Sequence, residues 1–219
     1  MCKLARYFET VPLSTSIREF PFVLLKLSES TDSSRLRSFM TNPASISLVH
    51  ESLSHEELLG IWSRIGDFVI TTSDMAVGNC TAGAVRAILR IAENFHSTAS
   101  LALFVLELSQ RNQFRGTEYS FIFAYYLEKN GNYVEAAELL ELASQNSAPS
   151  LEVLSLLGVI KKKQGLYQEA SDIYNRCCDR IATSEQKDRS ALAEFKLLLG
   201  DVERKQGKTF VRPEHEVSQ

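Results

Sequence analysis

A 34-residue repeat in the C-terminal half of the chain limits its fold more than any other feature of the sequence. The hexapeptide that begins at Gly131 returns at Gly165, with Gly, Tyr, Glu and Ala at matching places. A run with helical periodicity precedes each glycine, and another follows it. Pro149 lies between the two units, where one helix must end before the next begins. We therefore predict two consecutive helix–turn–helix units.

Apolar periodicity gives the expected bounds of the helices in these units. The four helices should span residues 119–129, 134–145, 151–163 and 168–181. A glycine just past a helix end adopts a left-handed backbone at little cost, so we expect tight reversals at Gly131 and Gly165. A further helix at 191–206, followed by a short polar tail, should cap the array.

Small and aromatic side chains recur around each turn. Tyr133 and Tyr167 should pack back over the turns. Ala136 and Ala170 lie early in the second helices, where a small side chain lets two helices approach closely. Because two antiparallel helices cannot bury their apolar stripes alone, such units are expected to stack.

These residues resemble the tetratricopeptide repeat, a 34-residue helix–turn–helix module. The repeat-defining residues are Gly131, Tyr133, Ala136, Gly158, Gly165, Tyr167 and Ala170. The first copy departs from the family at Ala124, where glycine is usual. The resemblance implies an all-α fold, namely a right-handed α-solenoid of stacked helix–turn–helix repeats.

The chain is expected to divide into four regions. They are an N-terminal segment of loop and short helix (1–48), an irregular helical region (49–115), the repeats with their capping helix (116–208) and a flexible tail (209–219). Within the second region, Ser54 and Glu57 form a capping box that predicts a helix start. Further helices are expected at 82–95 and 101–110, while 68–72 fits either an extended segment or a helix end.

Composition excludes several classes of protein. With 44% hydrophobic residues the chain is too apolar for intrinsic disorder, yet no apolar run approaches the roughly 18–20 residues of a membrane span. A net charge of −3 gives no reason to expect nucleic acid as a partner. The basic cluster 161–163 ends a predicted helix, where cations favour the helix dipole, so we expect it to be structural.

The cysteines and the N-terminal residues indicate a reducing cytoplasmic setting. No apolar signal core follows the first residues, and the four cysteines contain no C-x-x-C pair. We expect reduced thiols that fill small gaps. No cofactor is expected, because the stretch 78–83 has the glycine spacing of a P-loop but lacks the lysine that should follow.

A metal-dependent hydrolase is the alternative from a different functional class. His50 and His55 resemble the H-E-x-x-H zinc motif, but the spacing has one residue too many. On a single helix, two residues five positions apart diverge by about 140° and cannot share a metal on one face. We therefore predict that the protein has no metal site and is not an enzyme.

In stacked tetratricopeptide repeats, the first helix of each unit lines a concave groove. The residues that this register places in the groove are Phe121, Tyr125, Glu128, Ser155, Val159 and Lys162. The family's clamp for chaperone carboxylates needs Lys and Asn where this chain has Phe121 and Tyr125. The expected ligand is therefore an apolar helix or extended segment of another protein. Alternatively, the chain's own N-terminal region covers these two aromatic side chains.

A second resemblance concerns the partner complex. The stretches 6–9 and 20–27, with Pro12 between them, are similar to the segment that leads into the repeats of the TRAPP complex subunit 12 family. Residues 132–136 and a lengthened helix after Tyr174 are also similar, although 13–19 replaces a glycine- and arginine-rich stretch of that family. The resemblance implies a non-catalytic subunit of a tethering complex in ER-to-Golgi vesicle traffic, associated with membranes only through that complex.

A competing similarity is to the repeat domain of the Mad3/Bub spindle-checkpoint proteins. Phe123, Ala124, Glu128 and residues 145–148 lie at comparable spacing there. This likeness implies a kinetochore adaptor. Both similarities predict protein partners and no catalysis.

Overall fold

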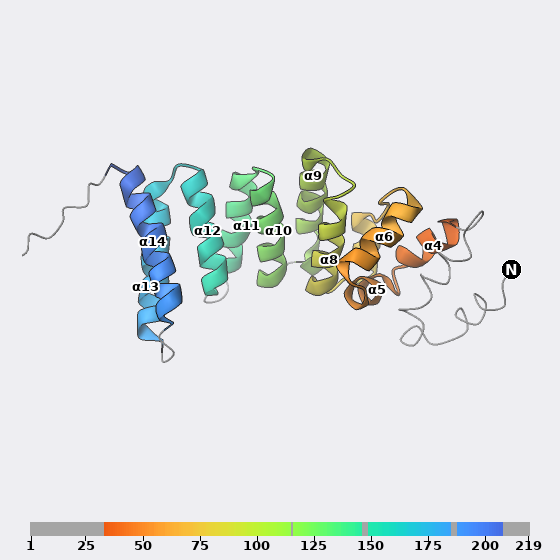
Figure 1. Ribbon diagram of the computed structural model, residues 1–219, viewed down its shortest axis with the longest axis horizontal. Coiled ribbons are helices and arrows are strands. Elements are labelled where there is room, and N and C mark those ends of the chain that lie inside the picture. Colours follow the sequence, from red (N-terminus) through yellow and green to blue (C-terminus); the bar gives the residue numbers. More distant parts are fainter. Residues whose placement is uncertain (1–32, 115, 146–148, 185–187, 208–219) are drawn as a thin grey trace, which may run out of the picture. The chain divides into compact units, whose positions relative to one another are not determined.

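The computed structural model describes residues 33–114, 116–145, 149–184 and 188–207 (Figure 1). These residues contain eleven α-helices, one short 3-10 helix and no strand, so the predicted all-α class is confirmed for this part of the chain. The expected tail and the stretches 6–9 and 20–27 lie outside the described residues. The chain separates into two compact units, Met1–Ile122 and Phe123–Gln219. The four-region division drawn from the sequence is finer and stays a prediction.

The first unit is built around α8. Its described elements are α4 (Ser33–Met40), α5 (Ile46–Ser52), α6 (His55–Ile65), α7 (Thr72–Val77), α8 (Ala82–Ala92), α9 (Thr98–Ser109), η1 (Asn112–Phe114) and the start of α10 (Thr117–Lys129). Helices α5 and α6 both pack on α8. Trp62 on α6 is completely buried, and its ring centroid lies 5.0 Å from that of Phe68. This aromatic pair forms part of the unit's core.

Capping boxes fix the start of two helices in the first unit. At α6 the Ser54 amide donates to Glu57 Oε2 at 2.8 Å and the Glu57 amide donates to Ser54 Oγ at 3.3 Å, which confirms the predicted box. Thr71 and Asp74 form a second box that opens the six-residue helix α7. Residues 68–71 before it are neither strand nor helix. Our reading of the sequence missed α7, since its six residues are too few to show periodicity.

The second unit consists of successive antiparallel helices. It contains the end of α10, then α11 (Tyr133–Gln145), α12 (Leu151–Lys163), α13 (Tyr167–Thr183) and α14 (Arg189–Lys205). Each of α12, α13 and α14 packs on the helix before it. The bounds of α12 agree with the prediction residue for residue, and those of the other helices in this unit agree within two residues.

The two predicted turns have the same backbone geometry. Gly131 has φ +85° and Gly165 has φ +80°, so both occupy the left-handed region as expected. One backbone hydrogen bond closes each turn, and the second bond lies 34 positions after the first. The Asn132 amide donates to Leu127 O at 2.8 Å, and the Leu166 amide donates to Lys161 O at 2.9 Å. These are the six-to-one hydrogen bonds of a Schellman motif. Each turn therefore reverses the chain by the same device.

At Gly158, α12 leaves no room for a side chain between itself and Tyr174 of α13. A Cβ atom on Gly158 would lie 2.5 Å from Tyr174 Cε1, so any side chain there would displace the ring. The residues 34 positions earlier are Ala124 and Leu140, and both are fully buried. The second hairpin thus combines a smaller residue on its first helix with a larger one on its second, whereas the first hairpin has alanine and leucine at these two places.

Replacing either turn glycine with alanine should destabilise the second unit. A left-handed backbone costs a residue with a Cβ atom about 1–2 kcal/mol, so we expect Gly131→Ala and Gly165→Ala each to lower the free energy of unfolding by about that amount. Urea unfolding monitored by circular dichroism measures the change. The matched control is Gly200→Ala in α14, where nothing lies within 4 Å of an added Cβ. That variant should gain about 0.8–1.0 kcal/mol from helix propensity. Shifts of the same sign in all three variants would contradict the prediction.

Candidate functional site

Five of the six predicted groove residues belong to the second unit. Tyr125, on α10, is 45% exposed, and Glu128 on the same helix is half-buried. The three residues of α12, Ser155, Val159 and Lys162, are all half-buried, and their i, i+4 and i+7 spacing puts them on one side of that helix. Phe121 is half-buried and belongs to the first unit.

The charged members of this set are paired within the chain. The three consecutive lysines at the end of α12 reach different neighbouring helices, because successive residues on a helix point about 100° apart. The pairs are Lys161 with Glu141 of α11 at 2.7 Å and Glu169 of α13 at 2.8 Å, Lys162 with Asp201 of α14 at 3.2 Å, and Lys163 with Glu128 of α10. The structural role predicted for 161–163 is thus fulfilled by ion pairs to four helices.

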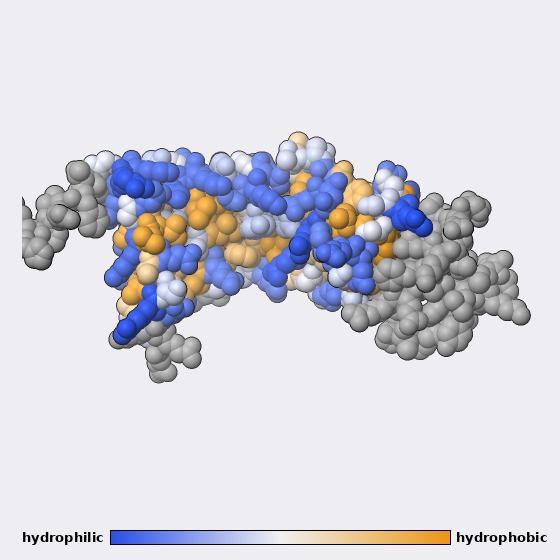
Figure 2. All heavy atoms as spheres, viewed as in Figure 1, coloured by the Kyte–Doolittle hydropathy of each residue, from blue (hydrophilic) through white to orange (hydrophobic). Residues whose placement is uncertain are grey.

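The charged groove residues are paired within the chain, so a ligand would meet mainly the uncharged ones. Lys162 binds Asp201, whose pKa is lowered by hydrogen bonds from Arg204 and Lys162. Glu128 accepts from Lys163 and raises the pKa of that ammonium group. On the face shown in Figure 2, apolar residues gather over α12 and α14. Among the five groove residues of the second unit, Tyr125, Ser155 and Val159 are therefore the ones that make no ion pair with another described residue.

A hollow of about 460 Å³ lies in the first unit, among α5, α6 and α8. We call it the α8 hollow. Its lining residues are His50, Glu51, Leu53, His55, Leu58, Gly83, Arg86, Ala87 and Arg90. The histidines of the rejected zinc motif thus line one cavity, but from two helices, since α5 ends at Ser52 and α6 begins at His55. Divergence around a single helix therefore does not apply to this pair, whereas the capping box at Ser54 does place His50 before the start of α6.

His50, one of the lining residues of the α8 hollow, is almost completely buried. It is 1% exposed, and its Nδ1 lies 2.8 Å from Ile46 O. A carbonyl oxygen only accepts, so Nδ1 carries the proton and Nε2 is left as the acceptor. Nε2 is buried and has no hydrogen-bond partner among the described residues. Burial lowers the pKa of His50 to about 4, which keeps the imidazole neutral at physiological pH. In the described ranges, no group of three His, Cys, Asp or Glu residues could hold a metal ion.

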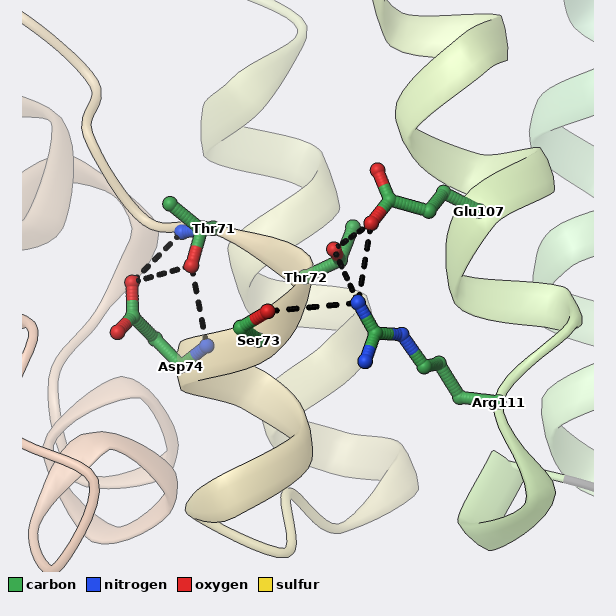
Figure 3. Close-up of polar contacts among 6 residues, drawn as sticks. All are labelled: Thr71, Thr72, Ser73, Asp74, Glu107 and Arg111. Carbon is green, nitrogen blue, oxygen red and sulfur yellow. Dashed lines mark hydrogen bonds and ion pairs between the residues drawn. The ribbon is translucent and has the colours of Figure 1, made fainter.

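A polar cluster joins α7 to α9 (Figure 3). Arg111 donates to Glu107 Oε1 at 3.0 Å, to Thr72 Oγ1 at 3.2 Å and to Ser73 Oγ at 3.3 Å. Thr72, which is buried, also donates to Glu107. Hydrogen bonds from Thr72 and then Arg111 lower the pKa of Glu107. Each of the six residues drawn has a hydrogen-bond partner among the other five, and the bonds of Arg111 and Thr72 connect α7 with Glu107 of α9.

The described cysteines are free thiols, as expected. Cys80 and Cys177 are buried and Cys178 is half-buried. Burial raises the pKa of Cys80 to about 12 and that of Cys177 to about 11. Thiols with such pKa values are poor nucleophiles at neutral pH. Cys2 lies outside the described residues.

Comparison of the chain with known protein families, with curated proteins and with solved structures found no match. Across the parts of the chain that the structure describes, no helix is both long enough and apolar enough to cross a membrane. The three resemblances stated from the sequence, to the tetratricopeptide repeat, the TRAPP complex subunit 12 family and the Mad3/Bub repeat domain, therefore stay proposals.

Proposed function

We propose that this protein is a non-catalytic adaptor that binds another protein through α10 and α12. The supporting observation is the equivalence of the two turns, with left-handed glycines 34 residues apart and matching closing hydrogen bonds. Hairpins with equal turns stack in a regular way, so we propose that they form a right-handed α-solenoid of tetratricopeptide type. In that arrangement α10 and α12 are the first helices of successive repeats, and α14 is the cap.

The chemistry of the proposed groove favours an apolar ligand. Tyr125 exposes 45% of its surface, and an aromatic side chain of this kind is a common anchor in protein interfaces. Val159 and Ser155 add a half-buried apolar and hydroxyl surface on α12. Lys162 and Glu128 keep their partners inside the chain. A helix or extended segment that brings an apolar side chain to Tyr125 and Val159 fits this surface.

For the complex, we propose a vesicle-tethering assembly of the TRAPP kind, acting on the cytoplasmic side between the ER and the Golgi. The length of α13 supports this choice. It has 17 residues against 13 in α11, which agrees with the lengthened helix after Tyr174 that the resemblance includes. Association with a membrane would then occur only through the complex.

Affinity purification of the full chain from cells, with quantitative mass spectrometry, tests the proposal. Wild-type protein should recover tethering-complex subunits. Tyr125→Ala and Val159→Asp should each reduce recovery about tenfold or more, since truncating an interface anchor commonly costs over 1.4 kcal/mol. Val134→Asp is the matched control, because Val134 is 60% exposed on α11, the second helix of its hairpin.

Three results would contradict parts of this proposal. Equal recovery with all variants would remove α10 and α12 as the binding surface. A loss with Val134→Asp as large as with Val159→Asp would indicate general damage to the repeat. Recovery of kinetochore proteins instead of tethering subunits would replace the proposed complex with the checkpoint alternative while leaving the adaptor role.

A further inference from the structure

We propose that the α8 hollow binds a small organic oxyanion, a carboxylate or phosphate attached to an apolar body, through Arg86 and Arg90. This site lies in the first unit and is independent of the proposed groove on α10 and α12. Both arginines line the hollow, and both belong to α8. The inference rests on their charge, their lack of partners and the apolar wall beside them.

The two guanidinium groups have no partner among the residues that the structure describes. Within the described part of the chain, Arg86 and Arg90 make no ion pair and no side-chain hydrogen bond. Other arginines of the same unit do find carboxylates, since Arg37 lies 3.5 Å from Asp67 and Arg111 lies 3.0 Å from Glu107. The α8 pair thus carries two positive charges that the described residues leave unneutralised.

The spacing of the pair suits one anion. Residues four apart on a helix are neighbours on its surface, and like charges there are mutually destabilising. An oxyanion between the two guanidinium groups would turn this repulsion into charge-assisted hydrogen bonds, and arginine matches the geometry of carboxylate and phosphate oxygens.

The carboxylate that lines the hollow does not serve as this anion. Glu51 is engaged by the Thr81 hydroxyl at the start of α8, and a Cβ on Gly83 would lie 2.7 Å from Glu51 Oε1. Arg86 and Arg90 follow Gly83 by three and seven residues, which is roughly 4.5 and 10 Å along the helix axis. Within the described ranges, Glu51 forms no ion pair with Arg86 or Arg90.

Apolar residues complete the site. Leu53, Leu58 and Ala87 line the hollow beside the arginines, and the first two are almost completely buried. A volume of about 460 Å³ falls within the usual range for sites that bind small organic molecules. An inorganic ion alone would leave most of this space unused, so the expected ligand carries a small hydrocarbon group.

Titration of the full chain at low ionic strength tests the site, with the arginine side-chain NMR resonances as the readout. The probes are 4-methylpentanoate, its neutral amide, phenyl phosphate and inorganic phosphate. We expect saturable shifts at Arg86 and Arg90 with 4-methylpentanoate or phenyl phosphate, and none with the amide, which has the same apolar body without the charge. The tighter of the two organic anions identifies the ligand as carboxylate or phosphate. If inorganic phosphate binds as tightly as phenyl phosphate, the apolar wall does not contribute to the affinity, and that part of the proposal is wrong.

Arg86→Gln and Arg90→Gln should each weaken binding of the preferred anion about tenfold or more, because each removes a charged donor. Both side chains are exposed, so these variants should fold, and thermal melts verify this. The matched control is Arg64→Gln, an exposed arginine of α6 outside the hollow, which should bind like wild type. The proposal fails if neither organic anion gives a saturable shift, or if Arg64→Gln loses as much affinity as the α8 variants.

Discussion

Replacing Tyr174 with alanine should lower the free energy of unfolding of the second unit by about 3–5 kcal/mol, the usual cost of truncating a buried aromatic side chain. Tyr174 is completely buried on α13. Its ring lies against Gly158 of α12, and its centroid is 6.3 Å from that of Phe195 on α14. Because three helices meet around this ring, the cavity left by alanine cannot close through the movement of one of them.

Chemical denaturation of the full chain measures this effect, and two variants serve as controls. Tyr167→Ala removes a half-buried tyrosine at the start of the same helix and should cost less than half as much. Tyr174→Phe keeps the ring but removes a hydroxyl that is buried without a hydrogen-bond partner in the described structure, so it should be neutral or stabilising. If Tyr174→Ala costs no more than Tyr167→Ala, the ring does not organise these helices.

Acidification should destabilise the first unit through His50. The pKa of the buried imidazole is lowered to about 4, against 6.5 for an ordinary histidine. Above pH 6.5 the group is neutral in both states. Between pH 6.5 and 4 the unfolded chain binds a proton that the folded chain does not, so stability falls as pH falls. With 1.36 kcal/mol per pKa unit, the total loss is about 3 kcal/mol and is complete below pH 4.

Unfolding free energies measured across this pH range, for wild type and His50→Leu, isolate the contribution. The leucine variant should lose most of the slope between pH 4 and 6.5. Part of the pH dependence of the unfolding free energy should remain, because burial also lowers the pKa of His96. A slope that His50→Leu does not change would show that the imidazole titrates equally in both states.

The repeat was predictable because its signals are local. Three kinds of signal act over no more than one or two helical turns. They are a glycine that needs a left-handed backbone, a run of helical periodicity, and a serine three residues before its hydrogen-bond partner. The bounds of α12, the positive φ angles of Gly131 and Gly165 and the capping box at Ser54 followed from such signals. The exposure of Tyr125 required the structure, since it depends on neighbouring helices.

The contacts that escaped prediction join residues far apart in the sequence. Arg111 reaches Thr72 across 39 positions, and each residue alone resembles an ordinary surface group. The α8 hollow escaped for a related reason. His50 and Arg90 line the same hollow only because α5 packs on α8. Short helices such as α5 and α7 also give weak periodic signals.

The ion pairs of the three lysines at the end of α12 depend on the length of that helix. One residue inserted before Lys161 would turn all three ammonium groups by about 100° and advance them by about 1.5 Å. Each would then face the wrong neighbour, so Glu128 and Glu141 would lose these counter-ions and Asp201 would keep only Arg204. Changes in chain length should therefore be tolerated in the connections between helices but not within α12.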